Sequence, residues 1–284
     1  MEMLPRTDAS ATGAAPRRLP RVLAYHKVAR FELGGTWVPP RRFARQMDAL
    51  LEAGFRFIDE AAFLDTLDGK REGSDREILL TFDDGYRVLL ESAVPVLEAR
   101  RIPALVFLVS AFAGMGNTWD LRLPGRRFTH LAWDEILDLA RRGFSFGSHT
   151  RTHRDLTLLP LDEMREEVVR SKRELESRLG TEVPSLSYPF AHSAATVRAE
   201  AARAGYRAAF TLHPKGTAAG PDRYELRREA VYVIDTVDTI KSKLGGGLAF
   251  QLEDGKGRMI NAFAGFIPLI KGSFSRTRTS FRRR

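Results

Sequence analysis

Two short segments of the chain combine residue types that can bind a metal ion and move a proton. The first, Thr-Phe-Asp-Asp-Gly, places Asp83 and Asp84 directly after an apolar run. The second, Gly-Ser-His-Thr-Arg-Thr-His, places His149 and His153 four residues apart. Two carboxylates at the end of a buried strand cost free energy unless a cation compensates them. One carboxylate and two imidazoles suit a divalent cation and leave coordination positions open for water and substrate.

Hydrolysis is the chemistry that such a site supports. A cation bound by this set lowers the pKa of its water and polarises a substrate carbonyl. A second carboxylate beside it can accept a proton as water attacks. One aspartate would therefore be a ligand and the other a general base, and the spacing does not say which. Taken singly, each segment has another explanation, because Asp-Asp-Gly is favoured in turns and His-x-x-x-His is common without a metal.

The segments that must position these residues alternate between strand-like and helix-like patterns. Helical spacing of apolar residues marks four ranges: 40–53, 130–142, 161–179 and 196–204. The helix at 161–179 is expected to be a surface helix whose Glu, Arg and Lys residues face outward. Strands separated by helices of this length predict a parallel sheet or barrel, in which ligands bind at the carboxyl ends of the strands. The short apolar runs expected as buried strands are 22–25, 78–82, 104–109, 144–146, 183–188 and 208–212.

Composition limits the classes of site and partner. The 284 residues include no cysteine, so disulfides and thiolate metal sites are excluded. The net charge is +9, but residues 245–284 contain eight basic and two acidic residues, which leaves the rest near balance. We therefore expect no nucleic-acid binding. No run approaches the roughly 18 apolar residues that cross a bilayer, and the first 20 residues lack the apolar core of a signal peptide.

These patterns predict a cytoplasmic protein in three parts: a disordered leader (1–20), a single catalytic domain (21–244) and a basic, partly apolar tail (245–284). In the tail, an apolar stretch at 259–270 precedes six basic residues. One interpretation is peripheral contact with anionic lipid at the inner face of the membrane, near a lipid-linked or exported saccharide. The other is packing against the domain followed by a disordered end.

The sequence resembles the polysaccharide deacetylase (NodB-homology) family. The aspartate and histidine segments resemble its first two motifs, and Ser-Tyr-Pro-Phe at 187–190 resembles the third. Smaller matches, including Tyr25-His26, extend the resemblance over about residues 22–231. It implies a distorted (β/α) barrel of about seven strands and a divalent metal, with zinc expected and cobalt or nickel as alternatives. The implied reaction is hydrolytic removal of N-acetyl groups from amino sugars of a polysaccharide or lipid-linked saccharide precursor, as in exopolysaccharide biosynthesis.

The resemblance also implies roles for individual residues. The first aspartate, Asp83, would be the general base. Many members begin the third motif with an arginine that contacts the base; here Ser187 takes that place, and Arg228 is a candidate substitute at the substrate site. The remaining assignments are metal ligation by Asp84, His149 and His153, and lining of the substrate groove by Tyr188, Pro189 and Phe190.

Two residues are candidates for the general acid. The family usually supplies it from a late Leu-x-His motif, for which His213 is the candidate here. Members that begin with a Tyr-His segment point instead to His26, which follows a predicted strand, and we favour His26. His130 is expected to be solvated at the start of a helix, and His192 to lie at the rim of the site.

Two other functions remain open. One is a deacylase that removes a different group, such as formyl or an O-acetyl ester. The other is a non-catalytic saccharide-binding protein on the same barrel, for which the absent third-motif arginine is an argument. A pure binding protein has no evident need for both Asp83 and Asp84, so catalysis is the favoured prediction.

Overall fold

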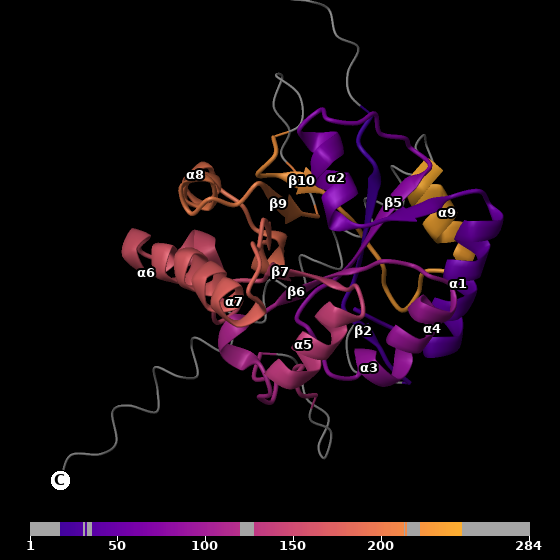
Figure 1. Ribbon diagram of the computed structural model, residues 1–284, viewed down its shortest axis with the longest axis horizontal. Coiled ribbons are helices and arrows are strands. Elements are labelled where there is room, and N and C mark those ends of the chain that lie inside the picture. Colours follow the sequence, from indigo (N-terminus) through magenta and orange to yellow (C-terminus); the bar gives the residue numbers. More distant parts are fainter. Residues whose placement is uncertain are drawn as a thin grey trace, which may run out of the picture.

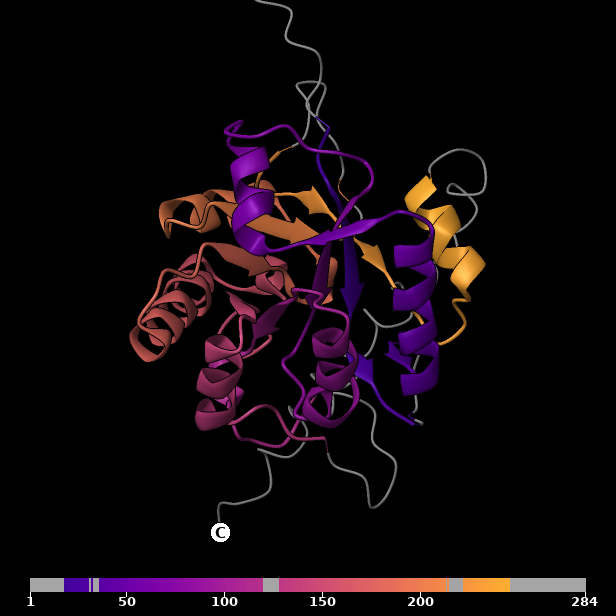
Figure 2. The same cartoon turned by 45° about the vertical axis from the view of Figure 1, so that its right-hand side comes forward.

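The computed structural model describes residues 18–30, 32, 36–119, 128–212, 214 and 222–245. The predicted leader and tail therefore lie almost wholly outside the described residues, as does His213. Within those ranges no helix has both the length and the apolar character needed to cross a membrane. Figures 1 and 2 show the strands near the centre of the molecule with helices around them.

The strands form a parallel sheet that is nearly closed into a barrel, which confirms the predicted fold class. In the described ranges the strand order is β10-β9-β8-β7-β6-β5-β1-β11, with β4 beside β5. A separate parallel pair, β2 (Lys27–Val28) and β3 (Trp37–Val38), lies after β1. The strands of the barrel are β1 (Arg21–Tyr25), β4 (Arg56–Ile58), β5 (Glu77–Phe82), β6 (Leu105–Leu108), β7 (Ser145–Ser148), β8 (Ser185–Ser187), β9 (Ala208–Thr211), β10 (Leu226–Arg227) and β11 (Glu229–Ala230).

One five-residue segment joins the two edges of the sheet. Leu226 of β10 pairs with Phe210 of β9, and three residues later Glu229 of β11 pairs with Leu23 of β1. Residues 226–230 thus act as a single last strand around the barrel, with Arg228 at the point where the pairing changes sides. Counted in this way, the ring agrees with the predicted number of about seven strands.

Helices cover the outside of the barrel where helical spacing predicts them. In helix α1 the apolar residues at helical spacing are Phe43, Met47, Leu50 and Leu51; the first three are buried, whereas Leu51 is 38% exposed and does not belong to that face. Helix α5 begins at Trp133, three residues later than predicted. The helices are α1 (Pro40–Glu52), α2 (Glu60–Leu67), α3 (Leu89–Ser92), α4 (Val94–Ala99), α5 (Trp133–Arg141), α6 (Leu161–Arg165), a π-helical turn (Glu166–Arg170) that continues into α7 (Ser171–Leu179), α8 (Ala195–Arg203) and α9 (Val237–Gly245).

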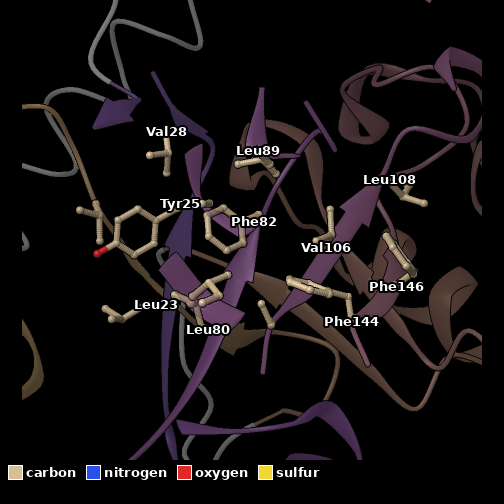
Figure 3. Close-up of a cluster of buried hydrophobic side chains, with 14 of the residues drawn as sticks. Leu23, Tyr25, Val28, Leu80, Phe82, Leu89, Val106, Leu108, Phe144 and Phe146 are labelled. Atoms are coloured by element: carbon tan, nitrogen blue, oxygen red, sulfur yellow. The ribbon is translucent and has the colours of Figure 1, made fainter. Parts of the chain in front are cut away.

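The core has two parts because successive side chains of a strand point to opposite faces. On the outer face, residues such as Tyr25, Phe82 and Phe146 pack between the strands and the surrounding helices (Figure 3). A second cluster combines strand residues such as Phe107 and Phe210 with three side chains of α2. The ring of Phe63 in α2 lies 5.6 Å from that of Phe210, so α2 supplies part of this second core.

Candidate active site

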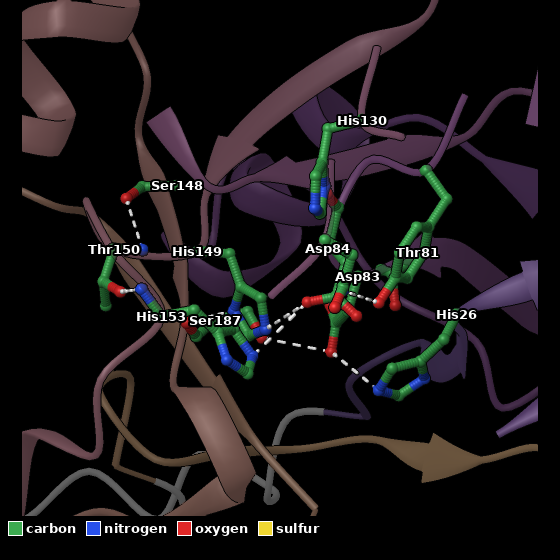
Figure 4. A network of polar contacts seen from close by, with 12 residues as sticks. His26, Thr81, Asp83, Asp84, His130, Ser148, His149, Thr150, His153 and Ser187 are labelled. Atoms are coloured by element: carbon green, nitrogen blue, oxygen red, sulfur yellow. Dashed lines mark hydrogen bonds and ion pairs between the residues drawn. The ribbon is translucent and has the colours of Figure 1, made fainter. Parts of the chain in front are cut away.

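The residues predicted to carry chemistry lie together at the carboxyl ends of the barrel strands (Figure 4). His26 follows β1, the two aspartates follow β5, and the two histidines of the second segment follow β7. Asp83, Asp84 and His149 are each at most 5% exposed. The strand ends of a parallel barrel converge, which explains how segments about 60 residues apart in sequence meet at one site.

Asp84, His149 and His153 are arranged as a candidate ligand set for one cation. The Oδ1 atom of Asp84 lies 3.3 Å from Nε2 of His153 and 3.7 Å from Nε2 of His149. One ligand atom from each residue can be chosen so that all three lie within 4.8 Å of one another. Ligand atoms about 2.0–2.2 Å from a shared zinc ion would be separated by distances of this order.

The protonation of the histidines agrees with metal ligation. His149 Nδ1 lies 2.8 Å from the backbone oxygen of Ser187, so this nitrogen must carry the proton and donate it. The lone pair of its Nε2 then faces Asp84, an arrangement that needs a cation between the two groups. Burial lowers the pKa of His149 and holds that of His153 well below its usual value. Neutral imidazoles with converging lone pairs and a carboxylate fit a divalent cation.

The backbone that carries these ligands is strained. Asp84, Thr150 and His153 have positive φ angles of 68°, 64° and 59°. This conformation is tolerated by aspartate but unfavourable for a β-branched residue such as threonine. Two local hydrogen bonds support the histidine loop: Thr150 N donates to Ser148 Oγ, and His153 N donates to Thr150 Oγ1, both at 3.2 Å. Backbone outliers of this kind cluster at functional sites.

Asp83 is held by a buried arginine rather than by the histidines. Arg228 donates from Nη1 to Oδ1 and from Nη2 to Oδ2 of Asp83, each at 2.7 Å, and its Nη2 also donates to Ser187 Oγ at 2.7 Å. Burial alone would raise the pKa of Asp83, but the charge and hydrogen bonds of Arg228 outweigh it and hold that pKa well below its usual range. Asp83 is therefore ionised and fixed in orientation.

The contact of Arg228 with Asp83 is the one expected of a substitute for the missing third-motif arginine. Its side chain is 1% exposed, and its guanidinium lies 5.3 Å from the centre of the Phe107 ring. These contacts of Arg228 are all with other buried residues of the protein. Ser187, which occupies the place of the usual arginine, accepts a hydrogen bond from this guanidinium.

His26 lies on the side of Asp83 away from the histidine pair (Figure 4). Its Nε2 is 4.0 Å from Asp83 Oδ2, and its side chain is 21% exposed, more than that of Asp83. Burial lowers the pKa of His26 to about 4, although the charge of Asp83 opposes this shift. The structure therefore brings the favoured general acid and the expected base together. The alternative, His213, is outside the described residues.

The third motif contributes one partly exposed side chain next to the ligands. Phe190 has a φ angle of 59°, and its ring lies 4.9 Å from that of His153. Tyr188 is 1% exposed and donates from its hydroxyl to the backbone oxygen of Tyr224 at 2.9 Å. Pro189 is also buried. Of the three predicted groove residues, Phe190 is therefore the one with a partly exposed side chain.

His130 was expected to be solvated, and this expectation is wrong. It is 3% exposed, its Nδ1 lies 2.7 Å from the backbone oxygen of Asp84, and its ring stacks on Tyr86 at 5.0 Å. The reason is a long-range bridge between Tyr86 and His130, which folds the segment before α5 onto the aspartate turn. Trp119, whose ring stacks on His153 at 4.5 Å and 14°, completes an aromatic wall there. Local sequence patterns carry no signal for such pairing.

Known proteins resemble this chain in both sequence and structure. Residues 70–209 match the family model described as polysaccharide deacetylase. YxkH of Bacillus subtilis (strain 168), which is provisionally named a polysaccharide deacetylase, is 27% identical over 218 residues, covering 76% of this chain and 72% of YxkH. IcaB from Ammonifex degensii is 26% identical with a TM-score of 0.68, over 80% of this chain and 97% of that chain. The Streptococcus pyogenes deacetylase PplD in complex with acetate is 21% identical with a TM-score of 0.70, and the match covers 81% of this chain and 99% of that chain.

Proposed function

Because the chain belongs to the polysaccharide deacetylase family, we propose that it is a metal-dependent hydrolase that removes N-acetyl groups from amino sugars. Its substrate would be a polysaccharide or a lipid-linked saccharide precursor. The observation that carries the proposal is the pairing of two units at the strand ends: the Asp84, His149 and His153 cluster and the ionised Asp83 beside it. A family of deacetylases that acts on polysaccharides supplies the class of reaction.

Each residue has a role in this proposal. Asp84, His149 and His153 would hold the cation, for which zinc is expected and cobalt or nickel are alternatives. When bound, the cation would polarise the acyl carbonyl and lower the pKa of a water molecule. Asp83 accepts a proton from the attacking water, and the paired guanidinium of Arg228 keeps that carboxylate ionised and oriented.

The leaving amine needs a proton, and His26 is the proposed donor. A pKa of about 4 makes His26 neutral at pH 7, so it must receive a proton during the reaction. Asp83 Oδ2 lies 4.0 Å from His26 Nε2. This separation exceeds a hydrogen bond, so one bridging water would carry the proton taken by Asp83 to His26, which then gives it to the amine nitrogen as the carbon–nitrogen bond breaks. The products are the free amino sugar and acetate.

Acetate release tests the proposed reaction. Wild-type protein should release acetate from N-acetylglucosamine oligomers or crude surface polysaccharide, lose this activity with a chelator and regain it with zinc or cobalt. Parallel assays with formylated and O-acetylated saccharides identify a different acyl preference. Stoichiometric metal without release from any of these substrates would leave the non-catalytic saccharide-binding function in its place.

We expect His26→Gln to lower N-deacetylation about 10²- to 10⁴-fold, the usual contribution of a general acid. The same variant should lose much less activity toward 4-nitrophenyl acetate, because nitrophenolate leaves without a proton. The ratio of the two rates, measured on one preparation, isolates the acid step. Equal losses on both substrates would assign His26 a structural role instead.

Cytoplasmic location, the three-part division of the chain and contact of residues 245–284 with a membrane stay predictions. The leader (1–20) and the tail (245–284) on which these predictions depend lie almost wholly outside the described residues.

A further inference from the structure

One continuous helix, formed by α6, the π-helical turn and α7, holds the loop that carries His149 and His153. The loop-facing residues of this helix are Glu167, Ser171 and Glu174. Ser171 Oγ lies 2.7 Å from Ser148 Oγ. Glu174 accepts hydrogen bonds from the side chains of Arg151, at 3.2 Å, and Ser110, at 2.6 Å. These contacts link the helix to the loop through side chains, and Glu167 differs from its neighbours in binding the loop backbone.

Glu167 is almost completely buried although it lies on a helix rich in charge. It is 5% exposed. Its Oε2 accepts hydrogen bonds from the backbone N–H groups of Arg151, at 3.0 Å, and Thr152, at 2.7 Å. Its Oε1 accepts a third hydrogen bond from the hydroxyl of Thr152. One carboxylate thus satisfies three donors from two consecutive loop residues, and hydrogen bonds to a charged acceptor are stronger than neutral ones.

The part of the loop that Glu167 holds lies between two strained residues. Thr150 and His153, which flank Arg151 and Thr152, have positive φ angles of 64° and 59°. Such conformations persist where the surroundings over-determine the backbone. The carboxylate of Glu167 supplies such a restraint at Arg151 and Thr152, the two residues just before His153.

The helix reaches the loop through an irregular turn. Residues Glu166–Arg170 form a π-helical turn between α6 and α7, and Glu167 is its second residue. Turns of this kind are rare and occur frequently at functional sites. The sequence pattern predicts that the glutamates of this helix face outward, and for Glu167 this prediction is wrong.

We propose that Glu167 is a positioning residue that sets the metal-binding geometry of His153. The inference rests on the proposed metal site and assigns to the chain a residue that acts on the cation through the loop backbone. Glu167 does not itself point at the ligand cluster. Its removal should therefore weaken metal binding without removing any ligand.

Metal affinity of the full-length protein, measured by calorimetry with Zn²⁺ or Co²⁺ alone, tests the inference. Loss of a group that orients a metal ligand typically weakens affinity about 10- to 100-fold, and we expect this for Glu167→Ala. Glu166→Ala is the matched control, because Glu166 is exposed and pairs with Arg170 at 2.9 Å. It should bind the cation as tightly as wild type. Glu167→Gln should recover most of the affinity, because an amide can accept from the backbone N–H groups and donate to the Thr152 hydroxyl.

The outcomes separate this inference from the proposed function. Wild-type affinity in Glu167→Ala overturns the inference alone, whatever the thermal stability of that variant in chelator. If Glu167→Ala does not fold, Glu167→Asp replaces it, because that change withdraws the carboxylate by one methylene and keeps its charge. Wild-type metal affinity of Glu167→Asp would likewise overturn the inference. Absence of metal binding by the wild-type protein overturns the proposed function and this inference with it.

Discussion

Replacing Asp83 by asparagine should lower acetate release about 10²- to 10⁴-fold while the cation stays bound. Asparagine has nearly the shape of aspartate but cannot accept a proton from water at neutral pH. Asp83 lies beside the ligand cluster rather than in it, because its two oxygens are occupied by Arg228. Steady-state kinetics and the metal content of the same purified protein measure both halves of the prediction.

Asp84→Asn is the matched control at the adjacent position. Oδ1 of Asp84 is the atom that faces both histidines, so this change should lower metal affinity and activity together. Two neighbouring isosteric substitutions would then divide into one that keeps the metal and one that loses it. Loss of metal from Asp83→Asn, or turnover by it close to that of wild type, would contradict the division between base and ligand. Rates should be compared per folded molecule, because Asp83→Asn also leaves the buried Arg228 with a weaker partner.

The parts of the site that follow single strands could be predicted from the sequence. The aspartate pair and the two histidines each come directly after a short apolar run, and the positions of β5 and β7 agree with those runs to within about two residues. Local hydrophobic patterning determines such strands. The alternation of strands and helices predicts a parallel sheet or barrel, and the family resemblance implies the barrel and its approximate number of strands.

The parts that depend on long-range pairing could not be predicted. His130 is buried because its segment pairs with Tyr86, more than 40 residues earlier in the chain. Glu167 is buried because it meets the backbone of a loop on another strand. Helix α2 supplies core side chains although it is not among the helices predicted from the spacing of apolar residues. For His130 and Glu167 the composition of the segment indicates a polar surface element, and the distant partner changes its role.

Arg228 shows how closing the barrel and holding the base are connected. It lies between β10 and β11, on the segment that pairs with β9 on one side and with β1 on the other. The strand that completes the ring therefore also brings a guanidinium to the base. The arginine expected in the third motif would lie on β8, where Ser187 stands, whereas here the charge comes from the segment that joins the two edges of the sheet.

Arg228→Met should lower the free energy of unfolding by about 3–5 kcal/mol, the usual cost of leaving one partner of a buried ion pair alone. Asp83 would then be a buried carboxylate without its compensating charge. The double variant Asp83→Asn/Arg228→Met should recover most of this loss, because it removes both charges. Urea unfolding of the three variants and wild type in the presence of chelator gives the coupling free energy directly.

A surface arginine provides the contrast for this cycle. Arg142 also forms two ion pairs, with Glu98 at 2.6 Å and Asp138 at 3.0 Å, but its side chain is 37% exposed. Exposed pairs contribute little, so Arg142→Met should unfold close to wild type. A cost for Arg228→Met no larger than that for Arg142→Met would show that the pair with Asp83 is not what stabilises this part of the barrel. Additive losses in the double variant would show that the two residues act independently, and the base would then have to be held ionised by groups other than Arg228.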